Sequence, residues 1–255
     1  MRLRVRFSKL GKVRWISHRD VARCLERAFR RVDLPVAYSG GFSPRPKVSF
    51  GLALPTGAES EAEYFDVQLV SEIDVDALPA RLSAALPVGI DVQAAVPIDD
   101  RAGSLQEEVV ACRWELSVRS DTSLETVRAR VDEALSASEL LVNRERKGVV
   151  VNDDIRPAIL SLEALETAVG GSGVVSASAE KPPVTLAAVL ATTNRGLRPA
   201  ELAAALGLDP AYVGLRRTHQ WIERDGARIE PLALAGPLSA GLAAERLNGG
   251  QRRAG

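Results

Sequence analysis

Cysteine and histidine are scarce in this sequence. Its 255 residues include two cysteines, Cys24 and Cys112, which lie far apart, and two histidines, His18 and His219, which lie 201 positions apart with no acidic or cysteine cluster around either. A disulfide framework needs paired cysteines, and zinc and iron–sulfur sites need grouped ligands. We therefore expect no metal site and no cofactor. Cys24 falls among the apolar positions of an expected helix and is interpreted as a small buried residue.

Long apolar runs and familiar catalytic motifs are also missing. No stretch reaches the roughly 18 uncharged apolar residues that a membrane-spanning helix requires. The N-terminus, MRLRVRF, alternates arginine with apolar residues where a signal peptide has an unbroken apolar core. We therefore expect a cytoplasmic protein without membrane contact. Neither a Gly-x-Ser-x-Gly motif nor a Gly-x-x-x-x-Gly-Lys phosphate loop occurs, so these two enzyme classes find no support.

The net charge of zero conceals an uneven distribution of charge. Residues 1–50 carry 13 Lys and Arg against 3 Asp and Glu, a net charge of +10, whereas residues 51–112 carry 2 against 12, a net charge of −10. A basic face and an acidic face can coexist on one fold. The average charge therefore says nothing about partners.

The first hundred residues predict the element order β-α-β-β-α-β. Arg2–Phe7 alternates as a strand, Ser17 is a helix N-cap with Asp20 three residues on, and His18–Arg31 has helical apolar spacing. The remaining elements are a short extended piece in VRWIS, strands in KVSFG and EYFDVQLV, a helix in DVDALPARLSAAL and a strand in IDVQAAVPI. This order is that of the ferredoxin-like split βαβ unit, an antiparallel sheet with helices on one face.

A second, looser round of the same plan follows the polar stretch 99–109. We expect strands at 112–118, 140–144, 159–165, 174–179 and 213–222, and helices at 123–137 and 199–206. The predicted fold class is therefore α+β, with two ferredoxin-like (split βαβ) antiparallel sheet domains in tandem. The domains are residues 1–100 and 110–233, and the Gly-rich segment 234–255 is expected to be a disordered tail.

Three arginines alternate along the first strand. If Leu3, Val5 and Phe7 face the helices, then Arg2, Arg4 and Arg6 point to the other face of the sheet. An open sheet face that carries cations is one way in which small α+β domains bind RNA. The alternative is that these arginines pair with the acidic residues 51–112 of the same domain.

The helix and the loop after it add further cations. Arg19, Arg23, Arg27 and Arg30 form a basic stripe, which could be a solvated helix face or a surface for protein or nucleic acid. In the loop SGGFSPRPKVSFG, residues 39–51, the prolines stiffen the backbone around Arg45, and Gly41 permits positive φ or close approach to a ligand. Arg45 and Lys47 are candidates for binding phosphate or carboxylate. The alternative is a hairpin whose prolines prevent edge pairing.

Support for catalysis is confined to one residue. His18 begins the first helix beside Ser17 and Asp20, and it could act as a general base in metal-independent RNA cleavage. Most single histidines at a helix N-terminus have no such role. His18 is therefore a weak catalytic candidate.

The first quarter of the chain resembles a known family. The run from Ser17 and His18 to Asp20, the motif Gly41-Phe42-x-Pro44-Arg45-Pro46-Lys47 and, more weakly, NDDIRP and GLRPAELAAALGL are similar to the radical-SAM-linked domain, a bacterial family of unknown function. In that family the domain is fused to a radical SAM protein or encoded beside one. The resemblance implies an accessory protein whose catalytic partner is a separate chain, because no Cys-x-x-x-Cys-x-x-Cys motif is present. The resemblance assigns no catalytic residue to this chain.

Together these observations predict a non-catalytic accessory protein that acts with a separately encoded radical SAM enzyme. It would bind an anionic substrate, which could be RNA, or present that substrate to the enzyme. The candidate binding residues are Arg2, Arg4, Arg6, His18, Asp20, Gly41, Arg45 and Lys47. Two alternatives stay open: a metal-independent RNA-processing enzyme that uses His18, and a module that binds only proteins.

Overall fold

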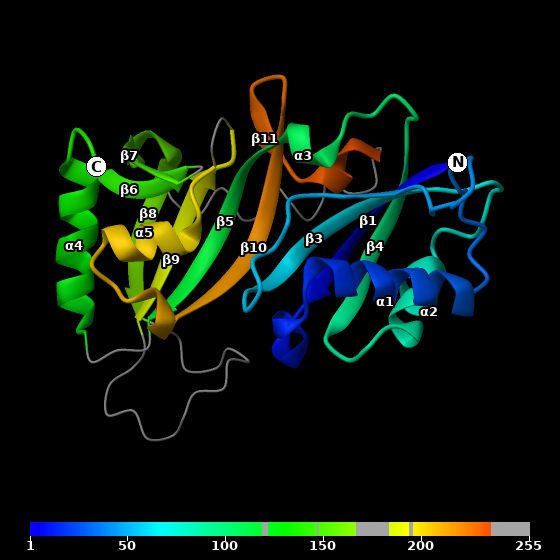
Figure 1. Cartoon of the computed structure of the whole chain (residues 1–255), viewed down its shortest axis with the longest axis horizontal. Helices are drawn as coiled ribbons and strands as arrows, with labels where there is room; N and C mark the ends of the chain where they lie inside the picture. The colour runs from blue at the N-terminus through cyan, green and yellow to red at the C-terminus, as the bar shows by residue number, and fades with distance from the viewer. Residues whose placement is uncertain (119–121, 147, 167–183, 194–195, 236–255) are drawn as a thin grey trace, which may run out of the picture.

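The computed structural model describes residues 1–118, 122–146, 148–166, 184–193 and 196–235. These residues form one nine-stranded mixed sheet and a separate two-stranded sheet, with helices packed on the large sheet (Figure 1). The predicted α+β class is confirmed at this level.

The first half contains the expected β-α-β-β-α-β order. Its strands and helices are β1 (Arg2–Lys9), α1 (His18–Arg31), β2 (Val48–Phe50), β3 (Glu59–Gln68), α2 (Leu78–Ala85) and β4 (Ile90–Ile98). β1 lies between β4 and β3, β2 pairs with the outer edge of β3, and all these pairings are antiparallel. The alternating pattern of β1 and the helical spacing of α1 therefore predicted these elements correctly.

Helix α1 covers the first half of the sheet with one apolar face. Val21, Leu25 and Phe29 pack with Leu3 and Phe65 of the strands in one buried cluster, and α1 and α2 lie in front of these strands in Figure 1. Burying each large apolar side chain contributes about 1.5–3 kcal/mol. This burial fixes α1 on the sheet and leaves its opposite face to solvent.

The second half has its own buried core. Its elements are α3 (Leu105–Glu108), β5 (Val109–Val118), α4 (Leu124–Ser136), β6 (Leu141–Arg146), β7 (Val149–Asp154), β8 (Ile159–Glu166), β9 (Val184–Ala191), α5 (Pro199–Ala205), β10 (Val213–Arg224) and β11 (Ala227–Ile229). The 3₁₀ helices of the chain are η1 (Gly11–Trp15), η2 (Arg156–Ala158), η3 (Pro210–Tyr212) and η4 (Pro231–Ala235). Helix α3 and strands β7, β9 and β11 were not predicted.

The two halves share one sheet. The strand order is β4-β1-β3-β10-β5-β9-β8, with β2 on β3 and β11 on β10, and Leu54 and Ala58 from the first half belong to the core of the second. The halves meet where β3 runs parallel to β10, with only Glu59 and Ser60 in register with Arg216 and Arg217. The predicted tandem of two ferredoxin-like sheets is therefore not confirmed as two separate sheets.

A buried ion pair reinforces this short junction. Nε and Nη2 of Arg217 on β10 donate to Oε1 of Glu63 on β3 at 3.0 and 2.5 Å, and Nη2 also donates to the Leu52 carbonyl at 2.8 Å. Arg217 is 1% exposed and Glu63 8%. The guanidinium also lies 5.4 Å from the centre of the Trp114 ring on β5. Arg217 thus connects both halves and the segment between β2 and β3.

The predicted extended piece VRWIS is wrong, because residues 11–15 form the 3₁₀ helix η1. The buried Lys9 ammonium donates to the carbonyls of Arg14 and Ile16 at 3.2 and 2.9 Å, and the Leu10 amide donates to the Gly89 carbonyl. These contacts curl the chain back at the end of β1. Burial lowers the pKa of Lys9, and the nearby Glu63 carboxylate opposes this effect.

Two predicted features lie outside the described residues: the strand at 174–179 and, except for its first two residues, the tail at 234–255. Among the helices of the described ranges, none is both long enough and apolar enough to cross a membrane.

The junction ion pair gives a stability prediction. Replacing Arg217→Met leaves the Glu63 carboxylate buried without its ion-pair partner, and we expect the free energy of unfolding in urea to fall by about 3–5 kcal/mol. The double variant Glu63→Leu with Arg217→Met removes both charges and is expected to recover most of that loss. A loss below about 1 kcal/mol in the single variant would mean that the pair acts like an exposed one.

Candidate nucleic-acid interface

The three arginines of β1 do not form an open cationic face. Arg4 is fully buried, and its Nε and Nη2 donate to the two carboxylate oxygens of Asp66 at 2.8 and 3.1 Å. Its Nη1 lies 3.6 Å from Glu108, and Arg2 donates to the same Asp66 at 2.8 Å. The expectation that Arg4 binds a ligand is therefore wrong, and the alternative of pairing with the acidic residues 51–112 holds.

Arg6 is paired as well. Its Nη1 donates to Glu230 at 3.0 Å and its Nε donates to the carbonyl of Glu61 at 3.2 Å. The 3₁₀ helix η4, which follows Glu230, contacts β1, β4 and β10. This face of the sheet is thus covered in part by the segment around Glu230 and η4, and Arg6 holds that segment. Arg2 instead donates to Asp66 and to the carbonyls of Asp100 and Ala102.

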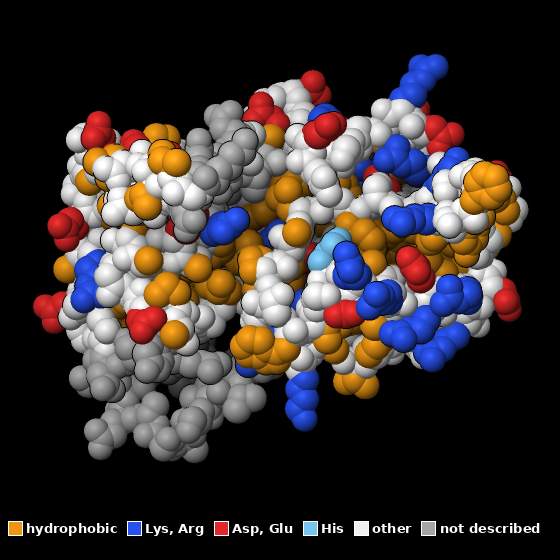
Figure 2. All heavy atoms as spheres, in the orientation of Figure 1, with side chains coloured by type: hydrophobic (Ala, Val, Ile, Leu, Met, Phe, Trp, Pro, Cys, Tyr) orange, Lys and Arg blue, Asp and Glu red, His pale blue; other side chains and the backbone are white. Residues whose placement is uncertain are grey.

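The helix stripe remains exposed. Arg19, Arg23, Arg27 and Arg30 all face solvent on α1, and Figure 2 shows Lys and Arg side chains gathered over this part of the molecule. Arg23 pairs with Asp20 at 3.3 Å, and Arg27 donates to the Cys24 sulfur at 3.4 Å. Within the described ranges, the side chains of Arg19 and Arg30 have no ion pair or hydrogen bond.

The loop before β2 is stiff and held by backbone hydrogen bonds. The Ser39 amide donates to the Arg45 carbonyl at 2.8 Å, the Arg45 amide donates to the Ser39 hydroxyl at 3.0 Å, and the Lys47 amide donates to the Ala37 carbonyl at 2.8 Å. Gly41 adopts a φ of 108°, in the range that favours glycine. Gly41 therefore helps to shape the loop. The backbone of the loop is a hairpin, as the alternative interpretation of the sequence expected.

The side chains of this loop are nevertheless free. Arg45 and Lys47 are exposed, and neither side chain bonds to another described residue. Phe42 at the tip is 111% exposed and Tyr38 at the base is 50% exposed. We call the exposed set Arg19, Arg23, Arg27, Arg30, Arg45 and Lys47 the cationic face. Sequence analysis missed the two aromatic side chains, although a phenylalanine between glycine and proline in a polar loop was the available signal.

A third exposed aromatic residue lies at the other end of α1. Trp15 is 62% exposed and ends η1, immediately before the helix. The guanidinium of Arg14 lies 5.3 Å from the centre of its ring. A Cβ at Gly57, whose φ is 90°, would lie 2.8 Å from this ring. The glycine therefore lets the indole pack closely against the backbone.

Asp20 acts as part of the helix cap. Its amide donates to the Ser17 hydroxyl at 3.2 Å, and that hydroxyl donates to the Asp20 carboxylate at 2.7 Å. The hydroxyl bond holds the pKa of Asp20 below its ordinary value, with a smaller contribution from Arg23. The carboxylate thus stabilises the start of α1, and nothing around it indicates a ligand.

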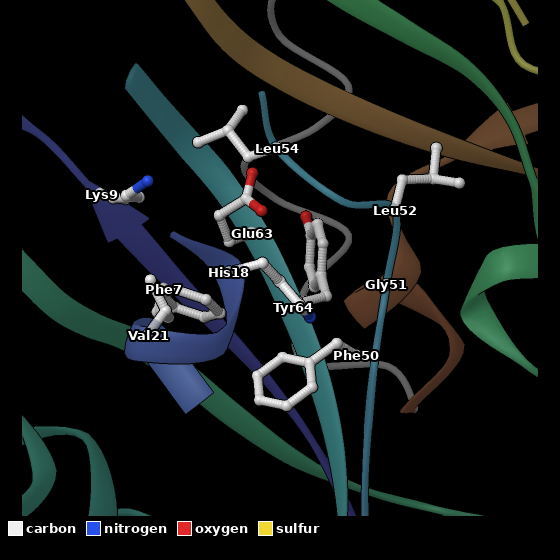
Figure 3. A pocket seen from close by; sticks show the side chains of 10 residues that line it. All are labelled: Phe7, Lys9, His18, Val21, Phe50, Gly51, Leu52, Leu54, Glu63 and Tyr64. Carbon is white, nitrogen blue, oxygen red and sulfur yellow. The ribbon is translucent and has the colours of Figure 1, made fainter. Parts of the chain in front are cut away.

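His18 lies at the mouth of a small pocket between α1, β1, β3 and the segment after β2 (Figure 3). Its ring meets the Phe50 ring edge-on, with 4.8 Å between the centres. No carboxylate or other hydrogen-bond partner of the His18 ring occurs in the part of the chain that the structure describes. This geometry lacks the orienting group that a catalytic histidine normally has. The described residues of the chain contain no group of three or more His, Cys, Asp or Glu placed to hold a metal ion.

The fold and this surface together define a mixed α+β protein with exposed cations on α1 and the loop before β2 and exposed aromatic side chains in η1 and that loop. Residues 2–199 match the family model DUF2344, described as "Uncharacterized protein conserved in bacteria". The chain belongs to this bacterial family.

Comparison with curated proteins gives no match. Among solved structures, the chain is similar to one in the "Crystal Structure of a Cbf5-Nop10-Gar1 Complex", with 11% sequence identity and a TM-score of 0.44. The match covers 88% of this chain and 50% of that one, so the chain spans about half the length of its structural neighbour.

The cap of α1 gives a prediction for the pH dependence of stability. Because the folded pKa of Asp20 lies below its ordinary value of 3.8, its contribution is complete above that value and is lost as the pH falls through the folded pKa. Asp20→Asn is therefore expected to lower the melting temperature at neutral pH and to make little difference in strong acid. Asp132→Asn, on the exposed face of α4, is the matched control. Equal effects of Asp20→Asn at both pH values would contradict the capping role.

Proposed function

We propose that this protein binds single-stranded RNA along its cationic face and acts as a non-catalytic accessory to a separate radical SAM enzyme. One observation carries the proposal: the stripe of exposed arginines on α1 is flanked along the chain by exposed aromatic side chains. Trp15 precedes the helix, and Phe42 and Tyr38 lie in the loop that follows it.

The dimensions of the face suit a short stretch of single strand. Helix α1 has 14 residues and is therefore about 21 Å long. Lys and Arg side chains bind phosphates, and exposed aromatic rings stack on bases whatever their sequence. Each stacked base is worth about 1–3 kcal/mol. An acidic protein could also use these cations and the exposed Phe42 ring, and the tests below distinguish that partner from RNA.

The stiffness of the loop adds to the case. Backbone hydrogen bonds, Pro44 and Pro46 hold the backbone of Arg45 and Lys47 in place before any ligand arrives. A preordered segment loses little conformational entropy on binding. The arginines of β1 stay outside this proposal, because their guanidinium groups are already paired within the protein.

The radical SAM part of the proposal rests on the resemblance of residues 17–47. The two cysteines of the chain are both buried and lack the spacing that holds an iron–sulfur cluster. Burial raises the pKa of Cys112 to about 11, so this thiol is protonated and unreactive at neutral pH. A radical enzyme that works with this chain would therefore contribute the cluster and the chemistry.

The repeated strand order supports a finer description of the fold. The first half pairs in the order β4-β1-β3-β2, and the second half in the order β10-β5-β9-β8. If the hairpin β6–β7 is an insertion, each half places its fourth, first, third and second strands side by side, as a split βαβ unit does. We include two ferredoxin-like units, fused through β3 and β10, in the proposal.

Binding to RNA is tested across a salt series. We expect the double variant Arg45→Ala with Lys47→Ala to bind oligouridine more weakly than wild type. The slope of log affinity against log salt should be shallower by about 0.7 for each phosphate that the variant no longer neutralises. The control Arg128→Ala with Arg228→Ala removes two exposed cations from outside the face and should leave both quantities unchanged. Absent binding, or equal effects of the two double variants, would remove the RNA proposal.

Incubation with RNA under chelator separates the accessory role from catalysis by His18. We expect wild type and His18→Ala to leave the RNA intact. Cleavage by wild type that disappears in His18→Ala would replace the accessory proposal with the enzymatic one.

The enzyme partner is tested by mixing the purified chain with a radical SAM protein from the same bacterium, with and without RNA. Co-elution on a sizing column is the expected result. Co-elution without any RNA retention would favour the module that binds only proteins, and no co-elution would remove the radical SAM part.

A further inference from the structure

The 3₁₀ helix η1 holds a tryptophan side chain out in solvent. Trp15 is 62% exposed, whereas Trp114 is 5% exposed and lies in the core of the second half. In Figure 1 η1 is the blue turn at the lower edge of the molecule, just before α1. A single exposed apolar side chain is ordinary on a protein surface. The way in which the surrounding chain holds Trp15 therefore decides whether this side chain has a role.

The buried Lys9 side chain fixes the backbone on both sides of Trp15. Lys9 is 3% exposed, and its ammonium donates to the carbonyls of Arg14 and Ile16 at 3.2 and 2.9 Å. The Arg14 carbonyl also accepts from the Gly57 amide at 2.8 Å. Burying an ammonium opposes folding unless it is hydrogen-bonded. Here its hydrogen bonds hold the two residues that flank the tryptophan.

The Trp15 ring is held as well as its backbone. The guanidinium of Arg14 lies 5.3 Å from the ring centre and is itself paired with Glu59 at 3.4 Å. Gly57 lets the chain pass close to the ring, because a Cβ at this position would lie 2.8 Å from it. The indole is therefore a preordered flat surface that is largely open to solvent. A preordered group loses little conformational entropy on binding.

The residues around Trp15 favour a nucleotide over a protein partner. Within residues 11–19 the exposed ones are Gly11, Lys12, Trp15, His18 and Arg19, so the indole is the one exposed apolar side chain of this segment. A 3₁₀ helix has three residues per turn, which puts Lys12 and Trp15 on the same side of η1. Protein hot spots are surrounded by contacts that exclude water. An isolated aromatic ring beside a cation matches instead the sites at which single-stranded RNA stacks its bases.

We infer that η1 is a nucleotide subsite, in which one unpaired base of the RNA strand stacks on the Trp15 indole and the Lys12 ammonium binds a neighbouring phosphate. This inference rests on the proposed function and deepens it, because Lys12 and Lys9 lie outside the cationic face. Lys9 is a positioning residue, since its ammonium contacts the backbone of η1. The N-terminal cap of α1 is not part of the subsite, because the Asp20 carboxylate already occupies it.

Tryptophan fluorescence tests the stacking directly, because a base stacked on an indole quenches its emission. We expect oligouridine to quench wild type and expect this quench to be absent in Trp15→Phe. Trp15→Phe keeps a flat ring and should bind nearly as tightly as wild type. Trp15→Leu keeps an apolar side chain without a ring and should bind about 10-fold more weakly. The control Trp221→Phe, on β10, should retain both the quench and the affinity.

Salt dependence separates the base contact from the phosphate contact. Lys12→Gln should make the slope of log affinity against log salt shallower by about 0.7, the value for one phosphate of a single strand. This variant should keep the quench. Trp15→Leu should keep the wild-type slope, because it removes no cation.

Lys9→Met tests the positioning role through its coupling to Trp15. Without the ammonium the ring is no longer held, so we expect binding of oligouridine to fall towards that of Trp15→Leu. The double variant Lys9→Met with Trp15→Leu should bind no more weakly than Trp15→Leu alone, because Lys9 acts only through the ring. Additive losses would overturn the positioning role. If Lys9→Met does not fold, the variants of the exposed Trp15 still decide the inference.

The outcomes separate the inference from the proposed function. Salt-dependent binding without quenching, or equal affinities of wild type and Trp15→Leu, would show that no base stacks on Trp15 and would leave the cationic face standing alone. If oligouridine does not bind to wild type, the proposed function falls and the inference falls with it.

A protein contact at η1 has its own result. Val88 is 97% exposed and precedes Gly89, whose carbonyl accepts a hydrogen bond from the Leu10 amide at the start of η1. If Trp15→Leu and Val88→Ser both abolish co-elution with the radical SAM protein and leave oligouridine binding unchanged, η1 contacts the enzyme and the inference is overturned. For a nucleotide subsite, Val88→Ser should leave oligouridine binding at the wild-type value.

Discussion

The buried pair of Glu63 and Arg217 is the contact on which the rest of the molecule depends. β3 and β10 share only two residues in register, so backbone hydrogen bonds alone give the two halves a short common boundary. Arg217 extends this boundary by bonding Glu63 and the Leu52 carbonyl, while its guanidinium lies against Trp114. The same contacts position the segment from Phe50 to Leu54. The contacts of Arg217 therefore stabilise both the wall of the pocket and the junction between the two halves of the sheet.

The uneven charge of the sequence has two separate outcomes in the fold. Part of the positive charge of residues 1–50 is neutralised internally, since Arg2, Arg4 and Arg6 pair with Asp66, Glu108 and Glu230. Lys9, Lys12 and Arg14 lie in β1 and η1, and the other cations of these residues lie on α1 and the loop before β2. A chain with a formal net charge of zero thus presents a distinctly cationic surface. Which arginines remain available is decided by tertiary pairing and not by their number.

Local patterns predicted much of the fold but little of the site. The alternation of β1 and the Ser17 cap of α1 depend on neighbouring residues, so the sequence alone defined them. The burial of Arg4 depends on Asp66, 62 positions away, and no local pattern reports such a partner. Sequence analysis predicted an extended piece in place of η1 because the curvature there comes from the Lys9 ammonium and Gly89. Trp15 is an apolar residue that a pattern assigns to the core, and only the folded chain reveals its exposure.

The Leu52 carbonyl links two distant parts of the molecule, because it accepts a hydrogen bond from the guanidinium that also lies on Trp114. The pocket wall is therefore tied by one side chain to β10 and β5, and through Trp114 to the core of the second half. This guanidinium therefore connects the edge of β3 to a core formed largely by residues much further along the chain.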